Sequence, residues 1–210
     1  MFSELLRERL RGIVELSPGQ CAALEAHYEL LVKWNRKLNL TSIRDLEEVV
    51  TRHYGESVFL GAHLPEGRLR IVDIGSGAGF PGFPVAVLRP ECAVTLVEAH
   101  QRKAVFLREA SRHLPNVRVV GLRAEEFEKG TGGSLRPSGP PAKSGDPFDC
   151  VISRAVSYDD LAPILKKMAA DADLLTGGEA PPEAIGFAWE GPIPVPWGRE
   201  RFLRRGCRIE

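Results

Sequence analysis

The first 64 residues have the spacing of amphipathic helices. Ser17-Pro18-Gly19-Gln20 matches a capping box with proline at the first helical position, which predicts a helix start. A second capping box, Asp45–Glu48, leads into Val49, Val50, His53 and Tyr54, and an earlier helix is expected over about Phe2–Val14. After the first box, mostly apolar side chains recur every three or four residues and share one helix face: Cys21, Leu24, Tyr28, Leu31, Asn35 and Leu38.

From residue 68 onward, short β-rich runs alternate with helical patterns. The runs are residues 69–74, 94–98, 117–120 and 148–152, and the clearest helical pattern covers residues 101–114. Strands that alternate with helices indicate right-handed βαβ units. We therefore expect a doubly wound, mostly parallel α/β sheet with an N-terminal helical extension. Residues 174–176 are the candidate for a fifth strand, and residues 184–205 for a closing hairpin.

The length of 210 residues suits one domain, or one core with a small appendage. We expect residues 1–66 to form a helical segment packed on the core, and residues 67–210 to form a Rossmann-like core. Residues 129–147 are rich in Gly, Pro and Ser and contain almost no apolar side chains. That composition predicts a flexible insertion within the core.

Composition narrows the class of protein. Hydrophobic residues make up 43% and charged residues 27% of the chain, which is ordinary for a soluble globular protein. No apolar run is long enough to cross a bilayer and no signal peptide is recognisable, so we expect a cytoplasmic protein without a membrane partner. The formal net charge is zero, which gives no hint of a nucleic-acid partner. Neither a zinc site nor a disulfide framework is expected, because the four cysteines lie far apart: Cys21, Cys92, Cys150 and Cys207.

The most specific motif is the glycine turn over residues 73–82, which follows the first predicted strand. Gly75, Gly77 and Gly79 let the backbone turn tightly and approach a ligand. Glu98 ends the next strand, 23 positions after Gly75, where a carboxylate can accept hydrogen bonds from both ribose hydroxyls of an adenosine. A dinucleotide fingerprint would place a glycine at position 80, which is Phe. The motif therefore favours S-adenosylmethionine over a dinucleotide or a purely structural turn.

Two later segments follow the third and fourth strands, where an adenosine ligand would need them. Arg123-Ala124-Glu125-Glu126 offers a backbone amide and a carboxylate to adenine, or else acidic residues that favour a helix N-terminus. Ser153-Arg154-Ala155 ends the fourth strand, at the carboxyl edge where doubly wound sheets bind ligands. Its alternative is a loop arginine paired with a surface acid.

Together these motifs resemble the ribosomal RNA small-subunit methyltransferase G family, also known as glucose-inhibited division protein B. Further matching motifs are Lys33-Trp34-Asn35, Asn39-Leu40-Thr41 and Arg52-His53, and the resemblance runs from about Leu31 to Ala155. It implies a class I methyltransferase that moves a methyl group from S-adenosylmethionine to guanine N7 in 16S rRNA. The cofactor contacts that it implies are Gly75, Phe80, Ala124, Glu125 and Arg154, with Glu98 at the family's usual acidic position. After Ala155 the chain departs from the family, because Leu174–Pro182 replaces a Pro-Gly-Gly turn and an apolar strand that ends in Lys-Gly.

Methylation of guanine N7 needs no general base, because N7 carries a free lone pair at neutral pH. The enzyme aligns the reactants and excludes water. This agrees with a sequence that has no evident Ser/His/Asp or Cys/His constellation. Arg154 is the candidate for a group at the junction of cofactor and guanine.

Basic residues at the two ends of the chain are the candidate contacts to 16S rRNA or the small ribosomal subunit. Trp34 or Trp197 could stack on a base, although a tryptophan in a helix is often core, and His53 is either a core or a functional histidine. A solvated basic face is the alternative for the charged residues. The candidate RNA contacts are Lys33, Arg36, Lys37, Arg44, Arg199, Arg201, Arg204, Arg205 and Arg208.

Three classes of function remain open on the sequence. The first is a monomeric rRNA guanine-N7 methyltransferase. The second is a methyltransferase that acts on a protein or a small molecule, which the neutral net charge and the altered C-terminal part would explain. The third is a non-catalytic RNA- or ribosome-binding protein that retains the fold.

Overall fold

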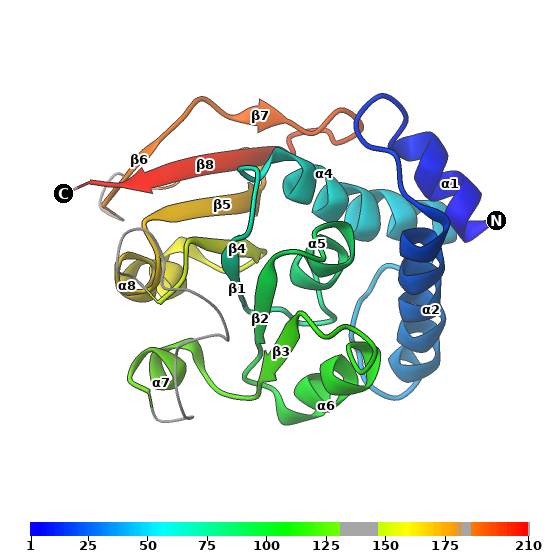
Figure 1. Ribbon diagram of the computed structural model, residues 1–210, viewed down its shortest axis with the longest axis horizontal. Coiled ribbons are helices and arrows are strands. Elements are labelled where there is room, and N and C mark those ends of the chain that lie inside the picture. Colours follow the sequence, from blue (N-terminus) through cyan, green and yellow to red (C-terminus); the bar gives the residue numbers. More distant parts are fainter. Residues whose placement is uncertain (131–146, 180, 182–185, 210) are drawn as a thin grey trace.

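A mostly parallel β-sheet forms the centre of the protein (Figure 1). The computed structural model describes residues 1–130, 147–179, 181 and 186–209, so most of the expected insertion at 129–147 lies outside the described residues. The strand order is β3-β2-β1-β4-β5-β8-β6, and β7 pairs with β8. The strands are β1 Arg70–Ile74, β2 Ala93–Val97, β3 Val117–Val120, β4 Cys150–Arg154, β5 Asp171–Thr176, β6 Phe187–Trp189, β7 Ile193–Pro194 and β8 Phe202–Arg208.

Helices precede the sheet and connect its parallel strands. They are α1 Phe2–Arg9, α2 Pro18–Asn35, α3 Leu46–Val49, the π-helix η1 Val50–Gly55, α4 Glu56–His63, α5 Gly82–Leu88, α6 Gln101–Ala110, α7 Ala124–Glu128 and α8 Tyr158–Met168. The capping box at Ser17 is confirmed, and the Asp45 side chain caps α3 by accepting from the Glu48 amide over 2.9 Å. The first helix ends at Arg9, earlier than expected.

The parallel strands confirm the expected doubly wound topology. β1 pairs with β2 on one side and with β4 on the other, both in parallel. The chain first builds outward through β2 and β3, and then returns to build through β4 and β5. The order therefore reverses between β1 and β4, and open α/β sheets bind their ligands at such a switch point.

The C-terminal strands differ in detail from the expected closing hairpin at 184–205. β8 covers Phe202–Arg208 and pairs antiparallel with β5, and β6 and β7 pair in turn with β8. β5 itself confirms the fifth strand expected at 174–176 and begins three residues earlier, at Asp171. The last part of the chain thus extends the sheet instead of forming a separate lobe.

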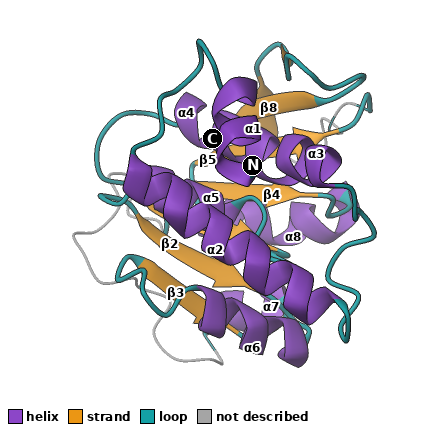
Figure 2. Ribbon diagram, turned by 90° about the vertical axis from the view of Figure 1, so that its right-hand side faces the viewer, coloured by secondary structure: helices purple, strands orange, loops and turns teal. Residues whose placement is uncertain are grey.

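Two hydrophobic clusters cover the two faces of the sheet. Side chains alternate between the faces along a strand, so Ile71 joins one cluster while its neighbour Val72 joins the other. The first cluster includes buried residues of α1, α2, α4, α5 and α6, and Figure 2 shows α2 crossing in front of the sheet. The second includes α7 and α8. Because both faces are covered, the central strands are buried along nearly their whole length.

Candidate functional site

The ends of four parallel strands meet at one edge of the sheet. Ile74 pairs with Val97 and Val97 with Val120, while Ile74 pairs with Ser153 on its other side. The residues that follow these positions therefore lie at one level: the glycine turn, Glu98, the segment before α7, and Arg154. The structure brings the candidates from four separate segments to the same edge.

The glycine turn begins at Gly75, directly after β1. Its first two amides, those of Gly75 and Ser76, both donate to the Val97 carbonyl over 3.0 Å. Gly75 has a φ of +72°, and a Cβ there would lie 2.6 Å from Cγ2 of Val156, in the loop after β4. Gly77 and Gly79 also have positive φ values. Only glycine allows this backbone to lie so close to the neighbouring loop.

Glu98 anchors the turn from the end of β2. Its Oε2 accepts from the Gly77 amide over 2.8 Å, and its Oε1 accepts from the His100 amide over 2.7 Å. The side chain is buried. Each carboxylate oxygen can accept a second hydrogen bond, so Glu98 still has acceptor capacity for a ligand's hydroxyl groups.

Asp73 lies beneath the turn as a fully buried carboxyl group. Its Oδ2 accepts from the Gly82 amide over 2.9 Å, whereas no donor among the described residues reaches Oδ1. Burial raises the pKa of Asp73 to about 7, against the opposing effect of its hydrogen bonds and of Arg154. An unpartnered buried carboxylate oxygen is costly and points to a group that the site is built to receive. Sequence reasoning missed this role, although Asp73 stands within the quoted motif.

Arg154 links the turn to the N-terminal helices. Its guanidinium lies 5.3 Å from the centre of the Phe80 ring, and its Nη1 donates to the Arg52 carbonyl in the π-helix over 2.7 Å. Burial lowers the pKa of Arg154 to about 10, while the carboxylates of Glu56 and Asp73 oppose that shift. Arg154 therefore stays a cation at neutral pH, close to the Phe80 ring.

Ala124 and Glu125 begin α7, one strand further from β1 than Glu98. Ala124 packs against the second hydrophobic cluster, and Glu125 is exposed. No hydrogen bond within the described part of the chain joins either residue to the glycine turn. The two residues therefore share the edge of the site without being part of the connected network around Asp73, Glu98 and Arg154.

His27 of α2 supports the turn from behind and is a residue that sequence reasoning missed. Its Nε2 lies 3.1 Å from the Ala78 carbonyl oxygen, and its Nδ1 lies 2.7 Å from the Tyr54 hydroxyl. Burial lowers the pKa of His27 to about 3, so the ring is neutral at pH 7. In that state Nε2 donates to the carbonyl and Nδ1 accepts from Tyr54. The helical spacing of the sequence could have indicated that His27 is buried, because it follows Leu24 of the apolar face by three positions.

His53, the other candidate histidine, also stands against the turn. Its ring stacks on Phe80 with centres 4.7 Å apart, and its Nε2 lies 2.7 Å from the Thr41 hydroxyl. Burial, and to a smaller extent the charges of Arg154 and Arg52, lower the pKa of His53 to about 3. His53 is thus a neutral packing residue between the π-helix and Phe80.

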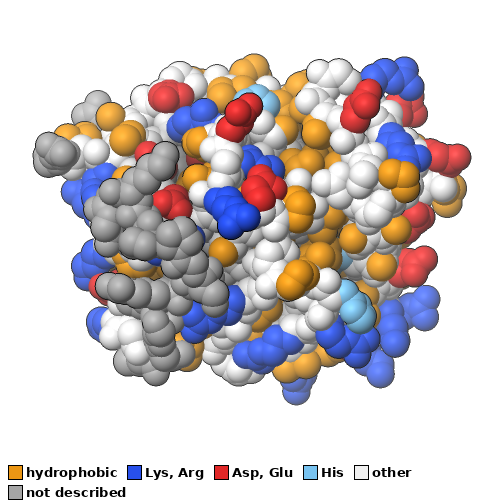
Figure 3. All heavy atoms as spheres, viewed as in Figure 1, with side chains coloured by type: hydrophobic (Ala, Val, Ile, Leu, Met, Phe, Trp, Pro, Cys, Tyr) orange, Lys and Arg blue, Asp and Glu red, His pale blue; other side chains and the backbone are white. Residues whose placement is uncertain are grey.

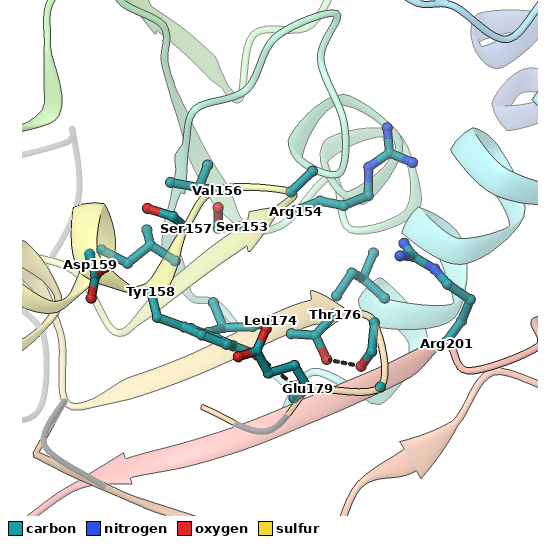
Figure 4. A pocket seen from close by; sticks show the side chains of 15 residues that line it. Ser153, Arg154, Val156, Ser157, Tyr158, Asp159, Leu174, Thr176, Glu179 and Arg201 are labelled. Atoms are coloured by element: carbon teal, nitrogen blue, oxygen red, sulfur yellow. Dashed lines mark hydrogen bonds between the residues drawn. The ribbon is translucent and has the colours of Figure 1, made fainter. Parts of the chain in front are cut away.

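A pocket of about 570 Å³ opens beside this edge, at the ends of β4 and β5 (Figure 4). Arg154 and Arg201 lie at one end of it, and Tyr158 and Glu179 at the other. The Tyr158 hydroxyl donates to the Glu179 backbone carbonyl over 3.2 Å. The volume lies within the range of small-molecule and nucleotide sites. The pocket thus combines an aromatic ring with groups of both charges.

Three arginines of the expected RNA-binding set have partners within the protein. Arg204 is buried and donates to the Thr176 hydroxyl and to the Gly178 carbonyl. Arg201 and Arg205 pair with the buried carboxylates of Glu56 and Asp173. Arg201 thereby joins the sheet edge to α4, Arg205 also donates to the His63 carbonyl at the end of α4, and Arg204 bonds within the sheet edge itself. For Arg204 and Arg205 the cause is the antiparallel pairing of β8 with β5, which sequence spacing does not show.

The remaining cations of that set are exposed. They are Lys33, Arg36, Lys37, Arg44 and Arg199. Arg208 donates to the Lys166 carbonyl over 2.7 Å. Of the two candidate stacking tryptophans, Trp34 packs edge-on against Phe106 and Trp197 packs against Phe59. Both indoles are partly buried.

Two further findings concern membrane-spanning helices and metal sites, neither of which the sequence favoured. Within residues 1–130, 147–179, 181 and 186–209, no helix has the length and apolarity to span a bilayer. Across the same described ranges, no three His, Cys, Asp or Glu side chains are grouped as metal ligands.

Comparison with known proteins yields consistent matches. The sequence model of the family described as rRNA small subunit methyltransferase G matches residues 20–175. The chain is similar to the ribosomal RNA small subunit methyltransferase G of Methylobacillus flagellatus, with 42% identity over 82% of this chain and 78% of that protein. The same-named protein of Nitrosomonas europaea is 39% identical over 80% of this chain and 73% of its own length.

Solved structures resemble the fold at low sequence identity. A SAM-dependent methyltransferase from Aquifex aeolicus aligns with a TM-score of 0.53 at 17% identity, covering 77% of this chain and 93% of its own. The structure of a fibrillarin/Nop5p complex aligns with a TM-score of 0.53 at 15% identity, covering 73% of this chain and 79% of its own. These likenesses confirm the class I, Rossmann-like architecture.

Proposed function

This chain belongs to the rRNA small subunit methyltransferase G family, and we propose that it transfers a methyl group from S-adenosylmethionine to N7 of a guanosine in 16S rRNA. The observation that carries the proposal is the arrangement of Gly75, Glu98 and Asp73 around one turn at the switch point of the sheet. We further propose that the protein acts as a monomer in the cytoplasm, on 16S rRNA or the small ribosomal subunit.

The residues around the turn suit this cofactor. Glu98 has remaining acceptor capacity for the two ribose hydroxyls, and the glycine backbone leaves no side chain between the ligand and the sheet. The unpartnered Oδ1 of Asp73 gives the turn a hydrogen-bonding group, and a ligand with a positively charged methionine end would favour the ionised form of this carboxyl, whose pKa is about 7. Gly77, Gly79, Phe80, Ala124 and Glu125 complete the proposed cofactor contacts.

When bound, S-adenosylmethionine supplies an electrophilic methyl group on a sulfonium leaving group. The chain's own contribution is to align and to shield. Arg154 is positioned by the Phe80 ring and by the Arg52 carbonyl, and the charges of Glu56 and Asp73 favour its cationic form, so it presents a defined cation at the boundary between turn and pocket. A cation there suits the O6 acceptor of guanine and leaves the N7 lone pair free. No residue has to remove a proton, because N7 is unprotonated at neutral pH.

The pocket at the ends of β4 and β5 is the proposed place of the target guanine. It adjoins Arg154, and Tyr158 offers an aromatic ring for stacking. RNA-binding proteins commonly read bases that are splayed out of single-stranded segments, and a concave site of this size suits such a base.

The direct test is methyl transfer from tritiated S-adenosylmethionine to 16S rRNA, both free and in small ribosomal subunits that lack the modification. We expect incorporation into at least one of the two, and 7-methylguanosine as the labelled nucleoside by mass spectrometry. The Glu98→Ala variant is the matched control, and it should show strongly reduced transfer.

Other outcomes would point elsewhere. Label in protein or in small molecules, with none in rRNA, would indicate a methyltransferase with a different substrate. Calorimetry that shows no binding of S-adenosylmethionine or its demethylated product, but clear binding of NAD, would contradict the cofactor assignment.

A further inference from the structure

A second groove lies between α2 and α6, apart from the pocket at β4 and β5. Its volume is about 570 Å³. Figure 3 shows Lys and Arg side chains gathered at the lower right, where Figure 1 places these two helices. The residues that line the groove are Lys33, Trp34, Lys37, Leu38, Arg102, Val105 and Glu109. None of the contacts that hold the cofactor turn involves these residues.

The charge in this groove is mainly positive. Lys33 lies in the last turn of α2, Lys37 lies in the turn just after this helix, and Arg102 lies on α6, so cations flank the groove from two sides. All three side chains are exposed, and none forms an ion pair with another residue of the described chain. Glu109 is the one carboxylate in the lining. On a chain with zero formal net charge, this local excess is a specific feature.

The floor of the groove is apolar and aromatic. Val105 is 48% exposed, one of the few large hydrophobic side chains that the described surface leaves open. Trp34 is partly buried and fixed by an edge-on contact with Phe106, their ring centres 5.8 Å apart. An indole that the core holds in place, beside an open aliphatic side chain, provides a rigid platform for a flat ring.

The position of the groove relates it to the cofactor edge. α6 starts at Gln101, so Arg102 lies in its first turn, four positions after Glu98. The groove therefore starts at the same edge of the sheet as the glycine turn and runs outward along α6. An RNA strand that entered the proposed cofactor site could continue into this groove.

We propose that the α2–α6 groove binds a single-stranded segment of the RNA substrate, with a base against Trp34 and Val105 and phosphates on Lys33, Lys37 and Arg102. Cations that flank an aromatic platform are the arrangement with which proteins bind single-stranded nucleic acid. The inference rests on the proposed function, since it assumes an RNA substrate. It adds Arg102 and Val105 to the RNA contacts and assigns Trp34 a stacking role.

The test compares two triple variants of the full chain. Lys33→Ala/Lys37→Ala/Arg102→Ala removes the groove cations, and Arg7→Ala/Arg11→Ala/Arg68→Ala removes three exposed cations elsewhere. Binding to 16S rRNA, free and in small subunits, is measured at several salt concentrations. We expect the groove variant to bind at least tenfold more weakly and its salt slope to fall by roughly 0.7 per lost contact. The control variant should bind like the wild type, and both should bind S-adenosylmethionine normally.

Tryptophan fluorescence tests the stacking role independently. RNA should quench part of the wild-type emission, and Trp34→Phe should remove that part while the fold is preserved. A wild type that binds and methylates RNA, with a groove variant of unchanged affinity and salt slope, would overturn the inference and leave the proposed function standing. A wild type with no RNA affinity would overturn both. A groove that binds polyglutamate and not RNA would assign it to an acidic protein partner and also overturn the inference.

Discussion

The Nε2 atom of His27 lies 3.1 Å from the carbonyl oxygen of Ala78, and this contact joins the N-terminal helix α2 to the middle of the glycine turn. The opposite ring atom, Nδ1, lies 2.7 Å from the hydroxyl of the fully buried Tyr54. Phe83 stacks on the imidazole with ring centres 4.1 Å apart. The helical segment is therefore part of the support of the proposed cofactor site, because it fixes the backbone of the turn at Ala78.

Replacing His27 with Gln should give a stability loss that depends on pH. The folded-state pKa of His27 is about 3 against an ordinary value of 6.5, so the unfolded chain takes up the proton first as the pH falls. The free energy of unfolding of the wild type therefore falls below pH 6.5 because of His27. The variant lacks this imidazole and does not show that pH-dependent loss. Urea denaturation should show that the difference in free energy of unfolding between wild type and variant shrinks by about 2 kcal/mol from pH 7 to pH 5. The exposed His113→Gln is the control, and a difference that stays constant for His27→Gln would contradict the neutral buried ring.

Asp73→Asn should raise the stability of the protein at higher pH and at the same time weaken its binding of S-adenosylmethionine. Since burial raises the folded-state pKa of Asp73 to about 7, the folded protein holds a proton that the unfolded chain has lost above pH 4. The contribution of Asp73 to the free energy of unfolding falls as the pH rises towards 7. Asparagine does not titrate, so the variant does not show this fall. We expect the variant to gain about 3 kcal/mol relative to wild type between pH 5 and pH 8. Calorimetry should show weaker S-adenosylmethionine binding, and unchanged binding at pH 8 would exclude a role for the Asp73 charge.

Glu98→Ala should weaken S-adenosylmethionine binding by about 1.5–3 kcal/mol, the usual cost of losing hydrogen bonds to a charged group. The variant also frees the amides of Gly77 and His100, so the turn itself loses support. Isothermal calorimetry measures the change, with the exposed Glu15→Ala as the control. If the folded variant kept the wild-type dissociation constant, Glu98 would be only a structural acid.

Arg201→Ala should destabilise the protein by about 3 kcal/mol, because it leaves the fully buried Glu56 with fewer partners. The Arg201 Nη2 lies 2.8 Å from Glu56 Oε2, and Arg52 is the other arginine paired with this carboxylate. The exposed Arg199→Ala should change the free energy of unfolding by no more than about 0.5 kcal/mol. Urea denaturation measures both. A loss below 1 kcal/mol for Arg201→Ala would show that the buried pair adds little.

The elements of this protein could be predicted from its sequence because their signals are local. Apolar runs of four to six residues, the capping box at Ser17 and the glycines after β1 each specify a backbone conformation within a few residues. The alternation of strands and helices then specifies the parallel sheet. Parallel strands align their carboxyl ends, so the meeting of the glycine turn, Glu98 and Arg154 also followed from the order of the motifs along the chain.

Only the tertiary structure decided which charged and polar side chains are free. Arg204 and Arg205 look like part of a basic cluster in the sequence, but antiparallel pairing of β8 with β5 places them against Gly178 and Asp173. His27 lies 51 positions from Ala78, and Lys37 lies 65 positions from Arg102. Local patterns carry no information about partners at such separations. The sequence alone determined the fold and the edge where the site forms, whereas the packing of helices and strands determined what supports the site and which cations remain exposed.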